Sequence, residues 1–148
     1  MAAITKSERK RVKVLFLCLG NSCRSPMAEA IARHAAGDVM EASSAGLIAL
    51  GFVARPTLNV LEERGYPAEG LHSKMLTRDA LDGADLVINM SGRPLPQLAN
   101  RKTHVEDWEV DDPYGEDPEV YSGTCQEIER RVKDLAERLR SENGMKQP

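Results

Sequence analysis

Long hydrophobic runs are missing from this sequence. No apolar stretch in the 148 residues approaches the roughly 20 residues that a membrane-spanning helix needs. The first eleven residues, Met-Ala-Ala-Ile-Thr-Lys-Ser-Glu-Arg-Lys-Arg, are charged and lack the apolar core of a signal peptide. We therefore expect no membrane partner. We also expect residues 1–10 to be a flexible basic leader and residues 142–148 to be a frayed tail.

Cysteine is scarce as well. Three cysteines are too few for the disulfide framework of a small secreted domain. The sequence has no CxxC pair, no HExxH motif and no lysine in a glycine-rich phosphate loop. These absences indicate a reducing, cytoplasmic setting and no metal or other cofactor, and they argue against a nucleoside triphosphatase.

An excess of positive charge is also lacking. Lysine and arginine number 20 against 23 acidic residues, and a net charge of −3 argues against a general nucleic-acid binder. Hydrophobic residues at 41% and charged residues at 29% are typical of a soluble globular protein. The length fits a single domain, which we place at residues 11–141.

One stretch near the N-terminus carries the chemistry. The apolar run Val12–Leu17 predicts a buried strand, and Ser25-Pro26 predicts a helix start with a hydroxyl cap and a proline at the first helical position. A loop between a strand and a helix N-terminus directs free N–H groups and the positive end of the helix dipole at one point. That point favours an oxyanion. Cys18 begins the loop and can form a thiolate. Arg24 ends the loop, and its planar guanidinium can donate two parallel hydrogen bonds to phosphate oxygens.

The rest of the chain alternates between strand and helix patterns. We expect helices at 26–36, 55–64, 77–81 and from 118 onward, further strands at 39–45, 85–90 and 103–105, and a loop at 91–102 with at most one helical turn. One apolar stripe marks the last helix and places Cys125 in the core: Tyr121, Cys125, Ile128, Val132, Leu135 and Leu139. Alternation of this kind predicts a parallel sheet with ligands at the carboxyl ends of its strands.

The run Cys-Leu-Gly-Asn-Ser-Cys-Arg-Ser-Pro at residues 18–26 resembles the active-site motif of low-molecular-weight protein tyrosine phosphatases. The resemblance extends from about Val12 to Arg140. It implies an α/β fold, a single domain with a four-stranded parallel sheet and helices on both faces (phosphotyrosine protein phosphatase I-like). It also implies a cysteine-dependent phosphatase that acts on a phosphorylated protein through a phosphocysteine, without a cofactor.

The resemblance assigns roles within the motif. Cys18 is expected to be the nucleophile and Arg24 to bind two phosphoryl oxygens. Ser25 is expected to cap the helix and donate a hydrogen bond to the Cys18 sulfur, and Ser44 matches a family partner of the loop asparagine. The family's histidine position falls on a leucine, so His72 receives no role. The expected phosphate-binding residues are Leu19, Gly20, Asn21, Ser22, Cys23, Arg24 and Ser25.

A phosphate ester also needs a proton for its leaving oxygen. The sequence offers seven acidic residues between positions 106 and 117, and composition does not choose among them. The family motif Asp-Pro-Tyr matches Asp112-Pro113-Tyr114. We therefore expect Asp112 to be the general acid and then the base, with Asp111 as runner-up. Asp117 is expected to begin the last helix, and Tyr114 to form part of the substrate rim.

Several activities use such a loop. Phosphotyrosine hydrolysis is the first expectation, with Leu47, Ile48 and Phe52 as possible further walls. Arginine-specific members of the family carry a small polar residue where this sequence has Ser22. The related arsenate reductases need a downstream cysteine pair, and residues 90–96 contain no cysteine.

Two further readings of the loop stay open. Cys23 resembles the second family cysteine that traps an oxidised Cys18 as a disulfide, and a packed loop thiol is an equal alternative. A non-catalytic module that binds oxyanions or phosphopeptides ranks low because both a nucleophile and an acid are present.

Overall fold

The computed structural model describes residues 11–95 and 103–142. The expected leader at 1–10, most of the tail and part of the loop at 91–102 lie outside these residues. The described strands are β1 (Val12–Cys18), β2 (Met40–Gly46), β3 (Leu86–Asn89) and β4 (His104–Asp107), and the helices are α1 (Arg24–Ala35), α2 (Arg55–Glu63), α3 (Arg78–Asp82) and α4 (Pro118–Glu142).

All four strands are parallel, in the order β2-β1-β3-β4. The apolar run that begins the domain forms β1, which is central because it pairs with both β2 and β3. Its last five residues are buried, as expected for a strand covered on both faces. The predicted fold class, a single α/β domain with a four-stranded parallel sheet, is confirmed.

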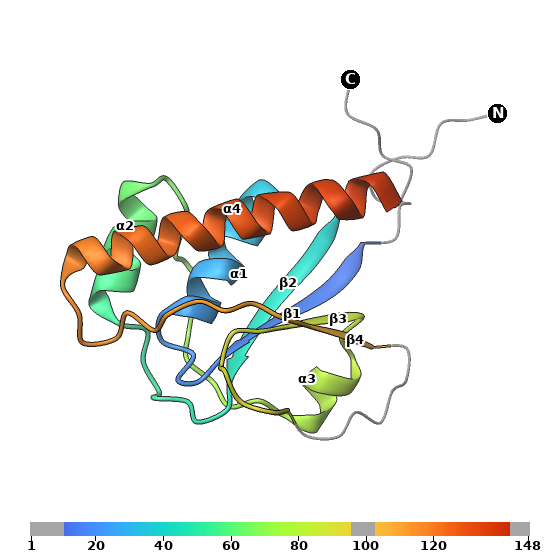
Figure 1. Ribbon diagram of the computed structural model, residues 1–148, viewed down its shortest axis with the longest axis horizontal. Helices are drawn as coiled ribbons and strands as arrows, with labels where there is room; N and C mark the ends of the chain where they lie inside the picture. The colour runs from blue at the N-terminus through green and yellow to red at the C-terminus, as the bar shows by residue number, and fades with distance from the viewer. Residues whose placement is uncertain (1–10, 96–102, 143–148) are drawn as a thin grey trace.

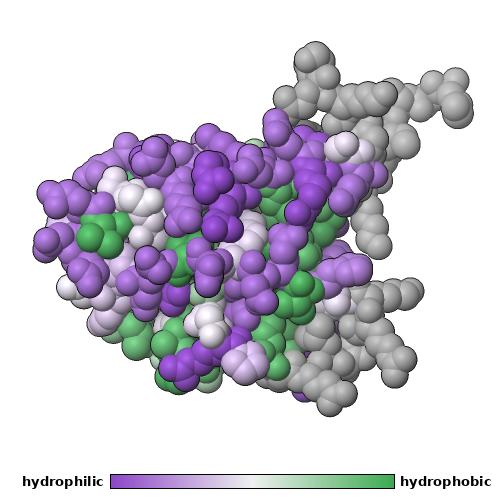
Figure 2. All heavy atoms as spheres, in the orientation of Figure 1, coloured by the Kyte–Doolittle hydropathy of each residue, from purple (hydrophilic) through white to green (hydrophobic). Residues whose placement is uncertain are grey.

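Helices cover both faces of the sheet (Figure 1). Phe16 points into the larger core with the apolar stripe of α4 and the buried face of α1, whereas Leu15 and Leu17 pack on the opposite face against Leu81 of α3. The outer surface of α4 is largely hydrophilic in Figure 2, consistent with its one-sided stripe. Within the described ranges, no helix is both long enough and apolar enough to cross a membrane.

The predicted start of α1 is wrong, and the difference changes the role of Ser25. The helix begins at Arg24, its N-cap is Cys23, and no side chain caps it. Ser25 is therefore the second helical residue and not the cap, and Pro26 is not at the first helical position. Ser25 instead turns its hydroxyl toward the end of β1. β4 also differs, because it covers His104–Asp107 where the sequence predicted 103–105.

Candidate active site

The loop at residues 18–25, which we call the cradle loop, turns its carbonyl groups outward. The carbonyls of Cys18, Leu19 and Gly20 accept hydrogen bonds from backbone amides of the segment after β2. The Ser22 carbonyl accepts from the Ala54 amide and, at 3.0 Å, from the side chain of Thr57. Among the described residues, the N–H groups of residues 19–22 have no acceptor. The loop therefore offers donors on its inner side, as an oxyanion site requires.

Asn21 holds the loop in shape. It has φ 48, in the left-handed region that asparagine tolerates better than most residues. Its side-chain amide donates to the hydroxyls of Ser25 at 2.7 Å and Ser44 at 3.0 Å, and its oxygen accepts from the Lys74 amide at 2.9 Å. A Cβ on Gly46 would lie 2.8 Å from the backbone nitrogen of Asn21, so only glycine fits at position 46. The predicted contact between Asn21 and Ser44 is present.

The Cys18 sulfur lies at the carboxyl end of β1, directly before the N-terminus of α1. Its Sγ is 3.0 Å from the Ser25 hydroxyl, and the cysteine is 2% exposed. The thiolate is the nucleophilic form of a cysteine. The Cys18 sulfur belongs to the same loop as backbone N–H groups that have no acceptor among the described residues.

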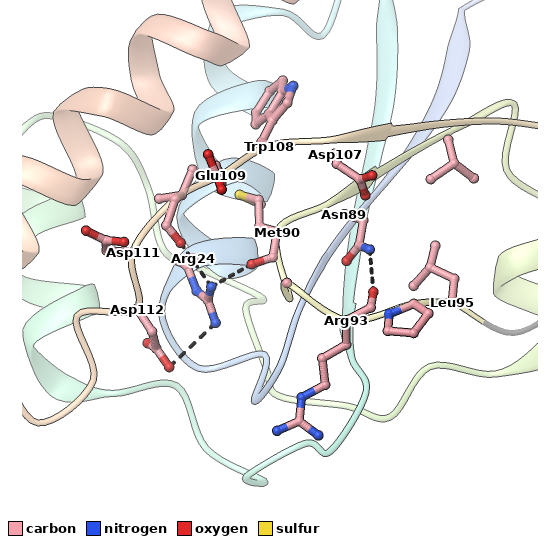
Figure 3. Close-up of a pocket in the computed structure, with 14 residues that line it drawn as sticks. Arg24, Asn89, Met90, Arg93, Leu95, Asp107, Trp108, Glu109, Asp111 and Asp112 are labelled. Atoms are coloured by element: carbon pink, nitrogen blue, oxygen red, sulfur yellow. Dashed lines mark hydrogen bonds and ion pairs between the residues drawn. The ribbon is translucent and has the colours of Figure 1, made fainter.

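Arg24 joins this loop to the two neighbouring strand ends. Its Nη1 donates to the carbonyl oxygens of Met90 at 2.5 Å and Val110 at 3.0 Å, and its Nη2 lies 3.5 Å from an Asp112 carboxylate oxygen (Figure 3). Its Nε is buried and finds no hydrogen-bond partner in the described part of the chain. The guanidinium is thus fixed through Nη1, while Nε and Nη2 form the edge that suits bidentate binding of an oxyanion.

A cavity of about 190 Å³ opens above the cradle loop. Asp112 and Tyr114 line it together with Cys18, although the two groups are nearly 100 positions apart in the sequence. The Asp112 carboxylate accepts a hydrogen bond from the Tyr114 amide at 3.1 Å. Leu50 and Ile48 form further apolar walls, and the Phe52 ring lies 6.4 Å from the Tyr114 ring. Leu47 is not among the lining residues.

The acidic runner-up lies elsewhere. Asp111 lines a second, larger cavity of about 710 Å³ between the segment after β3 and residues 107–112 (Figure 3). It is absent from the lining of the smaller cavity, whereas Asp112 lines both. Asp117 directly precedes α4, as predicted. Geometry therefore favours Asp112 over Asp111 for contact with a group bound at Cys18.

The two other cysteines differ in setting. Cys23 lines the cavity and contacts the Tyr121 hydroxyl at 3.7 Å, and burial raises its pKa. Burial also raises the pKa of Tyr121 to about 12 and that of Cys125 to about 11. Cys125 lies on the buried face of α4 and is fully buried, which confirms its predicted place in the core. All three cysteines are free thiols in this structure.

Some contributors to the site carry no local sequence signal. The carbonyls of Met90 and Val110 position Arg24, and any residue type supplies a carbonyl. Glu29 is a buried carboxylate within the alanine-rich α1, and it accepts from the Ser44 hydroxyl at 2.5 Å and pairs with Arg33 and Lys74. The His72 ring contacts the Gly70 backbone oxygen, and its carbonyl accepts from the Lys74 side chain, contacts that are consistent with its having no assigned role.

Comparisons with known proteins agree with this geometry. The family model described as low molecular weight phosphotyrosine protein phosphatase matches residues 13–145. Arsenate reductase 1 of Bacillus cereus is 36% identical over 126 residues, covering 84% of this chain and 93% of that protein.

Solved structures extend the range of activities. The YwlE arginine phosphatase of Geobacillus stearothermophilus superposes with a TM-score of 0.77 at 29% identity, covering 93% of this chain and 98% of that one. The tyrosine phosphatase Wzb of Escherichia coli K30, solved with sulphate, has a TM-score of 0.74 at 27% identity, covering 88% of this chain and 99% of that one. Proteins with this fold thus bear three different activity names.

Proposed function

The chain belongs to the low molecular weight phosphotyrosine protein phosphatase family, and we propose that it is a protein-tyrosine-phosphatase that works through a phosphocysteine. The observation that carries the proposal is the cavity that brings Cys18, Arg24 and Asp112 together. A thiolate, an oxyanion clamp and a proton donor are the three groups that transfer of a phosphoryl group to and from sulfur requires.

The proposed reaction has two steps. The Cys18 thiolate attacks phosphorus, the phosphorus–oxygen ester bond breaks, and the Asp112 carboxyl gives its proton to the leaving oxygen. A water molecule then attacks the phosphocysteine, gives a proton to the Asp112 carboxylate, and releases inorganic phosphate and the thiolate. Arg24 and the free amides of the cradle loop hold the phosphoryl oxygens in both steps. These residues provide the charge stabilisation without a metal ion.

The apolar wall of the cavity supports an aromatic leaving group. Tyr114 lines the cavity, and the Phe52 ring lies 6.4 Å from the Tyr114 ring, although Phe52 is not among the lining residues; both are about half exposed. Exposed aromatic side chains of this kind suit contact with the ring of a phosphotyrosine.

Phosphoarginine hydrolysis is the second candidate, and Ser22 is the observation that favours it. Its hydroxyl is buried, has no hydrogen-bond partner among the described residues and belongs to a residue that lines the cavity. A buried hydroxyl without a partner costs free energy, which a polar ligand group recovers. The guanidinium of phosphoarginine supplies such a group, whereas a phenol ring does not.

Arsenate reduction ranks below both phosphatase activities. The resemblance implies that such enzymes pass a disulfide outward through a cysteine pair, and residues 90–96 have none. Cys125 cannot substitute without movement of α4, because it is fully buried in the core. We expect no reduction of arsenate with thioredoxin as electron donor.

The deciding experiment compares substrates on purified protein in EDTA. We expect turnover of p-nitrophenyl phosphate and phosphotyrosine peptide, with loss of at least about 10⁴-fold in Cys18→Ser while inorganic phosphate still binds. Turnover that survives in Cys18→Ser would refute the nucleophile. Ser22→Ile is the matched test of specificity: a phosphatase acting on arginine loses phosphoarginine turnover and keeps phosphotyrosine turnover. Arsenate with thioredoxin is the third arm.

A further inference from the structure

An arginine of α4 contacts the segment that carries the proposed acid. We call residues 108–117 the acid loop. The Arg131 Nη2 donates to the carbonyl oxygen of Glu109 at 3.3 Å, and its guanidinium carbon lies 5.9 Å from the centre of the Trp108 ring. The same Nη2 lies 3.4 Å from a carboxylate oxygen of Glu127, one turn earlier on the helix. Arg131 thus combines a hydrogen bond and a cation–π contact to one end of this loop.

Trp108 links Arg131 to the sheet. It is 8% exposed, its ring packs 6.0 Å from the Phe16 ring, and its backbone amide donates to the Asn89 carbonyl at 3.0 Å. Its Nε1 donates to Glu106 at 3.2 Å. Glu106 in turn pairs with Arg138 of α4 at 2.8 Å. The start of the acid loop is therefore fixed between the sheet and α4.

Two arginines hold consecutive carbonyls of this loop. Arg131 reaches from α4 to Glu109, and Arg24 reaches from α1 to Val110 at 3.0 Å. Asp112 follows two residues later with a carboxylate that is 45% exposed, and its partners in the described residues are Arg24 and the Tyr114 amide. Figure 3 shows Trp108, Glu109, Asp111 and Asp112 in sequence along this path. The place of the carboxylate therefore depends on how the preceding residues are held.

We propose that Arg131 is a positioning residue for the general acid. It touches neither Cys18 nor the small cavity, and it acts through Trp108 and the Glu109 carbonyl to keep the Asp112 carboxylate over the sulfur. A displacement of about 1 Å in a catalytic group can cost on the order of 10²-fold in rate, so a distant anchor has kinetic consequences. This inference rests on the proposed phosphatase function.

The kinetic test compares Arg131→Met with Arg130→Met. Arg130 is the preceding residue on α4, its side chain is 65% exposed, and its ion-pair partner within the described residues is Asp134 at 3.9 Å. In Arg131→Met we expect kcat/KM to fall about tenfold for phenyl phosphate, which needs the acid, and less than about threefold for p-nitrophenyl phosphate, which departs readily. Inhibition by inorganic phosphate stays within about twofold. Arg130→Met behaves as the wild type, and Arg131→Lys recovers part of the loss because it keeps a donor but not the planar group.

An equal fall in kcat/KM for both substrates in Arg131→Met, or no fall, would overturn the positioning role. Trp108 is the only tryptophan in the chain, so its fluorescence gives a readout independent of turnover. We expect acrylamide to quench Trp108 more strongly in Arg131→Met than in Arg130→Met, and equal quenching would contradict the anchor. A wild-type protein without turnover would overturn the proposed function and with it the catalytic consequence. The quenching comparison would then still decide whether Arg131 holds the loop.

Discussion

The cradle loop and the acid loop meet at one cavity but are built in opposite ways. The cradle loop is a continuous stretch whose polar groups are buried, and its Asn21 side chain bonds to Ser25 in the same loop and to Ser44 of β2. The acid loop is mostly exposed and is held by side chains from distant helices, Arg24 and Arg131. The comparison teaches that the cradle loop is fixed by many buried hydrogen bonds, within itself and to the segments packed against it, whereas the acid loop is held through two arginine side chains.

Among changes to the acid loop, substitution of the Asp112 carboxylate is expected to have the largest effect. Asp112→Asn should lower kcat/KM for phenyl phosphate by about 10²–10³-fold, because the amide cannot give up a proton to the leaving oxygen. The loss should be smaller for p-nitrophenyl phosphate, and inhibition by phosphate should persist. Asp111→Asn is the matched control, with an expected change within about threefold. Steady-state kinetics on the two variants would move the role to Asp111 if their losses were reversed.

Disruption of the cradle loop should reduce stability as well as activity. Asn21→Ala removes three hydrogen bonds and leaves alanine at φ 48, and we expect a loss of roughly 2–4 kcal/mol in the free energy of unfolding. Urea denaturation measures this loss. Asn59→Ala, an exposed position on α2, is the control, with an expected change within about 0.5 kcal/mol. A stable Asn21→Ala protein that binds phosphate normally would show that the loop holds its shape without this side chain.

The smallest expected effect lies outside both loops. Glu129 of α4 accepts from the Tyr66 hydroxyl and pairs with Arg64 at 2.7 Å. Burial alone would raise the pKa of Glu129, but these two hydrogen bonds outweigh it and hold that pKa below its usual value. The ionised carboxylate thus adds stability above about pH 4.3, the pKa of an unfolded glutamate, and this stability is lost as the pH falls through the lower folded value.

Glu129→Gln therefore should lower the melting temperature near neutral pH, and the difference from the wild type should shrink below about pH 4. Asp134→Asn removes an exposed carboxylate on the same helix and serves as the control. Melting curves between pH 3 and 7 test the expectation. A constant difference across that range would show that ionisation of Glu129 does not contribute. Activity at neutral pH should be unchanged, since Glu129, Arg64 and Tyr66 are not among the residues that line the cavity at Cys18.

Prediction from sequence succeeded best where neighbours along the chain decide the structure. The strand of Val12–Leu17, the tight loop and the following helix are local consequences of an apolar run, a left-handed asparagine and a helix-forming segment. The start of α1 was mispredicted because Ser25 is a good cap in isolation. In the folded protein its hydroxyl bonds to Cys18 and Asn21, contacts that capping statistics do not include.

The sequence by itself determined the parallel α/β order, the Cys18–Arg24 loop and the apolar stripe of α4, since each is a pattern within one short segment. The family resemblance already favoured Asp112, but only the tertiary structure showed that Asp112 lines the cavity with Cys18 while Asp111 does not, and that Arg131 contacts the Glu109 carbonyl. The physical reason is range. A contact between an arginine side chain and a backbone carbonyl distant in the sequence produces no periodicity or spacing that sequence analysis can detect. The two groups come together only after the sheet and α4 have packed.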